Sequence, residues 1–346
     1  MSKNIGFVAL GQGGGNIGML LEKRGYTVLF MNTSQEDLDT LKDVKHSYHI
    51  TNGEGCNKDR DKSKSLIIED FDNIAKQIED KVKEDYIYVI FSAGGGTGSG
   101  GAPMLMDMLI QHTGRRVGAI TILPAKNEPL KTFINSYECF KELENVEGTC
   151  ATFILDNNRL ERTLINSTFC NLFDSFLGSS QHVHASGNID KAEVFEMLGA
   201  HGSAVICNTT DTEATTANAI KSFEQNIFAP IENDRVIRYI GISSTSPLNI
   251  EDVTKTVGVP LDIFQGTNPK ETLVMLCGLS YPYGALEEIR KMVAENQDMI
   301  TKNLTATQET KLAEGINFLN DIPAGKSKAP DKKIVDKSSI FAKYKK

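Results

Sequence analysis

The sequence predicts an α/β protein, in which a Rossmann-like domain with a parallel sheet is joined by a long central helix to a second α/β domain. Three observations lead to this expectation. Short apolar strands alternate with amphipathic helices in the first half, two glycine clusters directly follow two of those strands, and a helix with one apolar face precedes a second alternation. Such alternation is typical of a parallel sheet covered by helices on both faces.

The first half is expected to hold five strands and five helices. The strands are predicted at residues 5–10, 27–31, 86–92, 117–123 and 152–155. The helices are predicted at residues 16–24, 35–41, 61–82, 101–112 and 130–144. Because ligands bind at the carboxyl ends of the strands in such sheets, the loops that follow the strands are the first place to look for a site.

The second half begins with a helical stretch at about residues 167–184. Its apolar residues recur at the spacing of one helix face, and they are Phe169, Leu172, Phe173, Phe176 and Leu177. Further helices are predicted at 190–201 and 284–303, and another helix is expected to end near residue 228. Strands are predicted at 204–207, 236–243 and 272–279. We therefore predict a first domain at 1–165, the central helix at 166–187, a second domain at 188–281, a C-terminal helix at 282–322 and a flexible basic tail at 323–346.

Composition and charge narrow the class of protein. The six cysteines are scattered without metal-ligand spacing, which indicates reduced core thiols rather than a zinc site or a disulfide framework. No apolar run approaches the roughly 20 residues that cross a bilayer, and the start does not resemble a signal peptide. We therefore expect a cytoplasmic protein with no membrane partner.

The net charge of −8 is unevenly distributed along the chain. Residues 326–346 contain eight lysines and two aspartates, a net charge of +6 that leaves −14 for the remainder. A basic tail on an acidic body indicates either a separate interaction segment or a solubilising end.

Two glycine clusters follow two strands and open two helices. The first contains Gly11, Gln12, Gly13, Gly14, Gly15 and Asn16, and the second contains Gly94, Gly95, Gly96, Thr97, Gly98 and Ser99. Without Cβ atoms, such loops bring backbone N–H groups close to a phosphate, and the helix N-terminus that follows adds partial positive charge. Both clusters are predicted to bind phosphate, although the first alone also fits a tight turn or a dinucleotide loop.

The clusters differ from two common nucleotide-binding patterns. Neither is a Walker A loop, because no GxxxxGK[ST] occurs and neither contains a lysine, so we expect a bound Mg²⁺ to offset the phosphate charge. A dinucleotide site of the Rossmann kind needs an acidic residue at the end of the second strand, where this chain has Asn32, Thr33 and Ser34. This difference and the second cluster argue against an NAD-dependent enzyme.

The sequence GGGTGSG at residues 94–100 resembles the signature loop of the tubulin/FtsZ family, and the other loops follow that family's order through about residue 305. The resemblance implies a GTPase that binds GTP or GDP with Mg²⁺ and polymerises with itself head to tail. It places Gln12 near the magnesium ion. Besides the two glycine clusters, it assigns nucleotide contacts to Asn32, Thr33, Ser34, Gly55, Cys56 and Asn57.

The resemblance also implies a guanine site. Asn157 follows a strand, as does the family's asparagine that reads the guanine edge, and Phe169 resembles the aromatic residue that stacks on the base. For Phe169, packing in the core is the alternative. A second base contact about one turn later could be Asn171, Phe173 or Asp174, and the sequence does not decide between them.

The loop at residues 188–193 fits the family's NxDxx(D/E) pattern through Asn188, Asp190 and Glu193. In the family this loop enters the nucleotide site of the neighbouring subunit, where its acids position the attacking water. Orienting water against a γ-phosphate needs a polarising acceptor more than a strong base. The resemblance therefore implies catalysis that depends on polymer contact, whereas the pattern alone also allows Asn188 or Asp190 to cap the next helix.

Three segments resemble one branch of the family, the TubZ proteins of bacterial plasmids and phages: residues 54–60, 155–158 and 340–344. That resemblance implies treadmilling filaments that segregate plasmid or phage DNA in the bacterial cytosol. It also implies a DNA-bound adaptor, TubR, held by the C-terminal tail. The alternatives are a cell-division or phage-positioning homologue, an NAD enzyme, and a regulator that binds nucleotide without polymerising.

Overall fold

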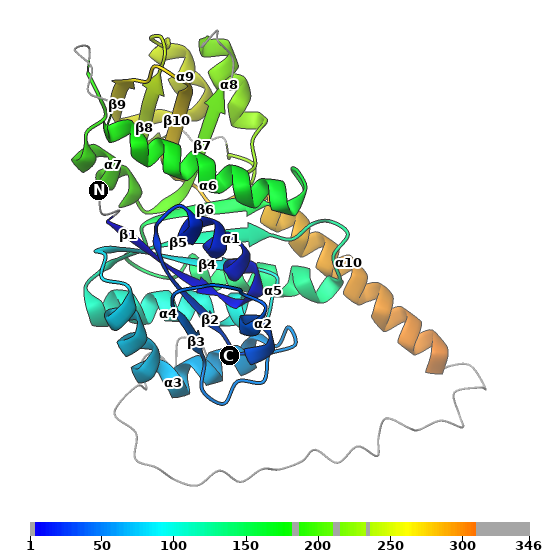
Figure 1. Ribbon diagram of the computed structural model, residues 1–346. Coiled ribbons are helices and arrows are strands. Elements are labelled where there is room, and N and C mark those ends of the chain that lie inside the picture. Colours follow the sequence, from blue (N-terminus) through cyan, green and yellow to red (C-terminus); the bar gives the residue numbers. More distant parts are fainter. Residues whose placement is uncertain (1–3, 182–186, 210–214, 233–235, 309–346) are drawn as a thin grey trace. The chain divides into compact units, whose positions relative to one another are not determined.

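In the computed structural model, a ten-stranded sheet organises the chain (Figure 1). The structure describes residues 4–181, 187–209, 215–232 and 236–308. The strand order is β3-β2-β1-β4-β5-β6-β7-β10-β8-β9. The strands are β1 (Ile5–Leu10), β2 (Thr27–Asn32), β3 (Ser47–His49), β4 (Tyr86–Ser92), β5 (Arg116–Leu123), β6 (Ala151–Asp156), β7 (Gly202–Thr209), β8 (Val236–Ser244), β9 (Val259–Thr267) and β10 (Thr272–Leu279).

Helices cover both faces of the sheet. They are α1 (Gly11–Lys23), α2 (Gln35–Asp39), α3 (Arg60–Lys81), α4 (Thr97–Thr113), α5 (Leu130–Leu143), α6 (Arg162–Gly178), α7 (Lys191–Leu198), α8 (Thr216–Glu224), α9 (Ile250–Val257) and α10 (Tyr283–Gln308). Helix α1 packs beside α2 and α6 on one face, and α4 packs between α3 and α5 on the other (Figure 1). The chain divides into two compact units, residues 1–290 and 291–346.

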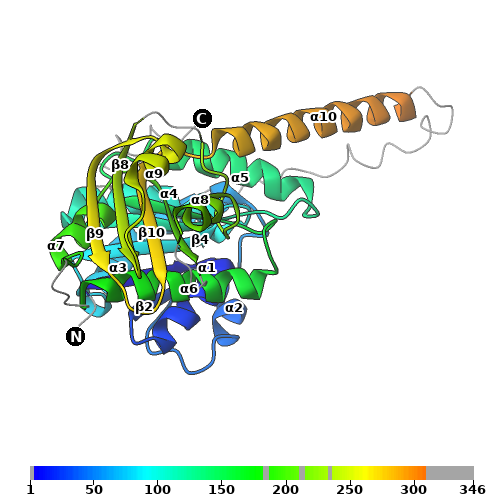
Figure 2. The ribbon, with the colours of Figure 1, turned by 90° about the horizontal axis from the view of Figure 1, so that it is seen from above.

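The sheet is mostly parallel, as the fold class predicts. From β3 to β7 in spatial order all neighbours are parallel, whereas β10 runs antiparallel to β7 and β8. Figure 2 shows β8, β9 and β10 side by side. Because β6 pairs with β7 from Ala151↔Gly202 to Phe153↔Ala204, both halves of the chain share one sheet. The domain boundaries inside the first unit stay predictions.

Two helices begin earlier than the sequence predicts, because glycine-rich residues form their first turns. Helix α1 begins at Gly11 and α4 at Thr97, rather than at 16 and 101. Glycine is a poor helix former, but close packing requires it here: a Cβ atom on Gly14 would lie 2.2 Å from the Ile90 carbonyl oxygen in β4. This close approach sets the start of α1 directly at the strand ends.

Sequence patterns did not indicate β3, α9 or β9. Strand β9 lies at the edge of the sheet, contains Pro260, and has one buried side chain, that of Phe264. Proline is tolerated on an edge strand because one side of its backbone has no neighbour to bond. The apolar alternation that marks a half-buried strand is therefore missing from this segment.

The core between α6 and the sheet is aromatic. Phe169 and Phe173 of α6 are buried, and their ring centroids lie 5.6 and 5.7 Å from that of Phe153 in β6. Burying a side chain of this size contributes about 1.5–3 kcal/mol of stability. These contacts fix the position of α6 on the sheet, and therefore also the positions of the residues at the two ends of α6.

The cysteines are free and buried, which confirms the prediction of reduced core thiols. Burial raises the pKa of Cys139 and of Cys207 to about 12, so both thiols stay protonated near neutral pH. Within the described part of the chain, every helix is too short or too polar to span a bilayer.

Candidate functional site

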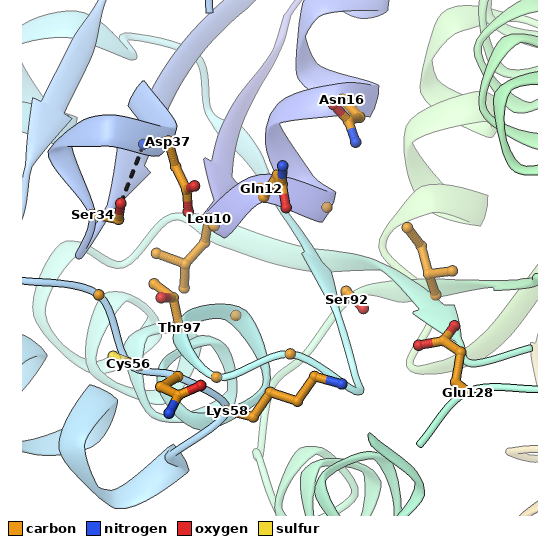
Figure 3. A pocket seen from close by; sticks show the side chains of 18 of the residues that line it. Leu10, Gln12, Asn16, Ser34, Asp37, Cys56, Lys58, Ser92, Thr97 and Glu128 are labelled. Atoms are coloured by element: carbon orange, nitrogen blue, oxygen red, sulfur yellow. Dashed lines mark hydrogen bonds between the residues drawn. The ribbon is translucent and has the colours of Figure 1, made fainter. Parts of the chain in front are cut away.

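A pocket of about 440 Å³ opens at the carboxyl ends of β1 and β4 (Figure 3). The starts of α1, α4 and α6 and the loop before α3 surround it. Many of the nucleotide contacts predicted from the sequence line it, namely Gly11, Gln12, Gly13, Asn16, Ser34, Gly55, Cys56, Asn57, Gly95, Gly96, Thr97, Gly98 and Asn157. The fold thus brings five loops that are far apart in the sequence to one cavity.

Two helix N-termini meet at one end of this pocket. Helix α1 begins at Gly11 and α4 at Thr97, and in neither does the preceding residue, Leu10 or Gly96, provide a side-chain cap. The first N–H groups of both helices are therefore available to an acceptor, and the two helix dipoles add positive potential. A phosphate group is the kind of ligand that fits such an end.

Side-chain contacts connect the loops around this end. Thr33 Oγ1 lies 2.7 Å from Thr97 Oγ1 and 3.3 Å from Cys56 Sγ. Asn32 Nδ2 donates to Asp37 Oδ2 at 3.1 Å. Thr33 and Asn32 therefore hold the loops in place and do not line the pocket. Other predicted contacts outside the lining are Gly14, Gly15, Gly94 and Ser99.

The other end of the pocket is lined by amide side chains and an ion pair. Asn157 follows β6, and Asn166 lies on α6 one turn after Arg162. Arg162 Nη2 donates to Glu128 Oε1 at 2.9 Å. Amide groups offer both donors and acceptors, and a guanidinium plane can stack on a purine ring. This end therefore has the chemistry to hold a base.

Phe169 does not line the pocket. Its ring is fully buried between Phe153 and Phe228, with centroids 5.6 and 6.2 Å away, so the core-packing alternative describes its position and the stacking role has no support. The three candidates for a second base contact are also engaged elsewhere: Asn171 with Arg24, Phe173 in the core, and Asp174 with Tyr26 at 2.8 Å.

Sequence patterns missed several polar residues of the lining, namely Asp37, Lys58, Ser92, Glu128, Arg162 and Asn166. Arg162 and Asn166 were missed because the apolar spacing placed the start of the helix at 167, whereas α6 begins at Arg162. Lys58 lies outside the two glycine clusters, whereas a Walker-type lysine would lie within one of them. The signal that would have found Arg162 and Asn166 is their four-residue spacing directly after the Asn157 loop.

The predicted catalytic residues Asn188, Asp190 and Glu193 lie outside the pocket lining. Glu193 N donates to Asp190 Oδ1 at 2.8 Å, and Asp190 N donates to Glu193 Oε2 at 2.7 Å, which forms a capping box at the start of α7. The capping alternative thus describes these acids in the single chain. The Asp190 residue is exposed to solvent.

The loop that carries these acids is held near the amino end of β4, whereas the pocket lies at the carboxyl end of that strand. Phe195 of α7 packs on Tyr86 with tilted rings whose centroids lie 4.7 Å apart, and Tyr86 Oη donates to the Phe195 carbonyl oxygen at 2.9 Å. Tyr86 begins β4, whereas Ser92, which lines the pocket, ends it. Seven residues of strand span about 20 Å. Within one chain, the acidic residues therefore lie far from the pocket of that same chain.

Comparisons with known proteins agree with this geometry. Residues 4–164 match the GTPase domain of the tubulin/FtsZ family, and residues 193–280 match the C-terminal domain of the tubulin-like protein TubZ. TubZ of Clostridium botulinum C phage is 30% identical to the chain, over 99% of this chain and 100% of that one. A tubulin-like protein CetZ of Pyrococcus abyssi is 27% identical over 70% of this chain and 69% of that one.

Solved structures show the same fold. The crystal structure of the Clostridium botulinum phage c-st TubZ has a TM-score of 0.78 at 30% identity, and the match covers 86% of this chain and all of that one. A GTPγS-form protofilament of Bacillus thuringiensis serovar israelensis TubZ has a TM-score of 0.75 at 15% identity, covering 86% and 94% of the two chains. The second likeness shows the fold alone.

Proposed function

The chain belongs to the tubulin/FtsZ family, and a TubZ protein is similar to it over the whole length of both chains. From this family membership we propose that the chain is a GTPase that polymerises head to tail and hydrolyses GTP between subunits. The observation that carries the proposal is the separation of the two halves of the site. The pocket lies at the carboxyl ends of the strands, and the acidic loop is held where β4 begins.

The pocket binds GTP or GDP in this proposal. The N-termini of α1 and α4 hold the phosphates, while Asn157 and Asn166 bind the base and Arg162 stacks on it. Gln12 and Asp37 both line the pocket and offer the oxygen ligands that Mg²⁺ prefers (Figure 3). When bound, Mg²⁺ supplies charge neutralisation at the phosphates.

The acids act on the nucleotide of the next subunit. Head-to-tail stacking of identical subunits places the acidic loop of one subunit against the pocket of the next, because the two surfaces lie at opposite ends of β4. There the Asp190 and Glu193 carboxylates orient the attacking water, with Asn188 beside them. The TubZ of Bacillus thuringiensis, which has the same fold, forms a protofilament.

The filaments serve to segregate plasmid or phage DNA in the bacterial cytosol, through an adaptor of the TubR kind. The proposed docking segment is the basic tail at 323–346, which lies outside the described residues. Eight lysines there suit an acidic protein surface or DNA phosphates. A chain ending at residue 322 should still polymerise but fail to co-sediment with adaptor-bound DNA. Retained co-sedimentation would mean that the tail is not the docking site for the adaptor.

Light scattering and phosphate release over a protein concentration series test the proposed function. After GTP and Mg²⁺ are added, we expect scattering above a threshold concentration and a specific rate of phosphate release that rises with it, because each active site needs two subunits. A specific rate independent of concentration, without scattering, would instead mean that the pocket works alone. Nucleotide binding without turnover would identify a regulator.

A further inference from the structure

Two tyrosines of β4 hold the C-terminal half of α7. Tyr86 Oη donates to the Phe195 carbonyl oxygen at 2.9 Å, and Tyr88 Oη donates to that of Leu198 at 3.3 Å. Because Tyr86 and Tyr88 are two residues apart on one strand, both side chains point to the same face of the sheet. Leu198 is the last residue of α7, where carbonyl groups depend on partners outside the helix. These hydrogen bonds therefore fix α7 in a defined position along β4.

Two cations extend the contact between Tyr86 and Phe195. Arg116 Cζ lies 5.1 Å from the centroid of the Tyr86 ring, and Lys191 Nζ lies 5.7 Å from that of the Phe195 ring, distances at which a cation is attracted to an aromatic face. Arg116 Nη1 also donates to Tyr86 Oη, so this hydroxyl accepts from β5 while it donates to α7. The four side chains form one stack that ends at Lys191, the residue directly after Asp190.

The C-terminal half of α7 determines where the acidic residues at its start lie. The helix has eight residues and is therefore about 12 Å long, too short to bend appreciably. Asp190 and Glu193 are tied to its first turn by the capping box, so their carboxylates move with the helix. The buried side chains of α7 are apolar, and apolar contacts are not directional. The hydrogen bond from Tyr86 is therefore the kind of contact that sets the direction of the helix.

We propose that Tyr86 is a positioning residue for hydrolysis on the next subunit, acting through α7 on Asp190 and Glu193. The inference rests on the proposed function and adds to it the residue that aligns the acidic loop. Tyr86 begins the strand whose other end, at Ser92, lines the pocket of the same chain. A change at Tyr86 nevertheless impairs the site that this subunit completes on its neighbour, and leaves its own pocket intact.

The test begins with Tyr86→Phe, which keeps the ring and removes the hydroxyl. At saturating GTP with Mg²⁺ we expect phosphate release per polymerised subunit to fall about five- to tenfold, because a small displacement of a catalytic group slows the reaction steeply. GTPγS affinity should stay within about twofold of the wild type. The control is Tyr281→Phe, which removes another buried hydroxyl, one that contacts Thr152 at 3.3 Å. It should lower the melting temperature by a similar amount and leave turnover unchanged.

Mixing variants in one polymer shows which half of the site Tyr86→Phe damages. With Gly95→Asp, which damages the pocket but keeps the acidic loop, the mixture should release several times more phosphate than the two variants separately. With Asp190→Asn, which damages the loop, the mixture should release no more than the two separately. The opposite pattern, with recovery beside Asp190→Asn alone, would place the damage in the pocket and overturn the inference.

Two further results would overturn a positioning role for Tyr86. One is wild-type turnover in Tyr86→Phe, and the other is a loss of turnover that Tyr281→Phe shares in proportion to its loss of melting temperature. In either case Tyr86 only stabilises the fold, and the proposed function stands if wild-type hydrolysis still rises with polymer. A wild-type rate that is independent of protein concentration would instead remove the proposed function, and the inference with it.

Discussion

Asn166 and Arg162 lie four residues apart at the start of α6, and both line the pocket. Residues with this spacing share one face of a helix. Phe169 follows Asn166 by three residues, yet its side chain is fully buried against the sheet. The face of α6 that meets the pocket is therefore polar, and the proposed base site is lined by amide and guanidinium groups rather than by an aromatic ring.

We expect Asn166→Ala to weaken GDP binding by roughly five- to tenfold, because one hydrogen bond to the base is worth about 1 kcal/mol net. Titration with a fluorescent GDP analogue measures this change. Asn171→Ala is the matched control, since Asn171 lies on the same helix with Arg24 as its partner and outside the pocket. Unchanged GDP affinity in Asn166→Ala would exclude Asn166 from the base site.

Phe169 also shows what residue spacing can and cannot predict. The three- and four-residue recurrence of apolar residues correctly indicated one buried face of the central helix. It could not tell whether an aromatic residue on that face meets a ligand or the sheet, because that depends on strands distant in the sequence. The glycine-rich end of the pocket was easier to locate from the sequence, since strand, glycine cluster and helix are contiguous there.

Among the elements, α7 and its capping box matter most for the mechanism. Asp190 and Glu193 each accept a hydrogen bond from the other's backbone N–H, and Phe195 anchors the helix on Tyr86. The loop before α7 is also held: a Cβ atom on Gly266 would lie 2.6 Å from Ile189 N, so the loop packs closely against β9. Both carboxylates therefore have fixed positions in the single chain.

Asp190→Asn separates the capping role from catalysis. Asparagine caps helices as well as aspartate does, so the melting temperature should stay near that of the wild type, while phosphate release in polymer falls by about 100-fold or more. Thr215→Ala is the control, because it removes a comparable cap from α8. It should cost about 1 kcal/mol of stability and leave turnover per polymerised subunit unchanged.

Two outcomes would contradict a catalytic role for Asp190. In the first, Asp190→Asn hydrolyses GTP at the wild-type rate, which would make the carboxylate dispensable. In the second, Asp190→Asn and Thr215→Ala lose turnover in proportion to their loss of stability, which would make Asp190 a helix cap and nothing more.

On the scale of the whole molecule, the order of strands and loops was predictable and the joining of the two halves was not. Apolar strands and intervening helices gave β1, β2, β4, β5 and β6 to within a residue or two at each end. The pairing of β6 with β7, which continues the sheet into the second half, is a contact between segments about 50 residues apart. No local pattern encodes such a pairing, because it depends on which faces remain to be covered once both halves have folded.

In the proposed mechanism each active site needs two subunits, and a mixing experiment tests this requirement most directly. Gly95→Asp puts a negative charge into the phosphate end, at a position with space for a side chain, and leaves the acidic loop intact. Asp190→Asn keeps the pocket and removes the catalytic carboxylate. Each variant alone should release little phosphate, because each lacks one half of every site.

Mixed in equal amounts, the two variants should recover about a quarter of the wild-type rate, because about that share of random head-to-tail contacts joins an intact pocket to an intact loop. Phosphate release is measured together with sedimentation, which shows that both variants enter the same polymer. Recovery in the mixture is the result that this account predicts. A co-sedimenting mixture that releases no more phosphate than the two variants separately would contradict hydrolysis between subunits.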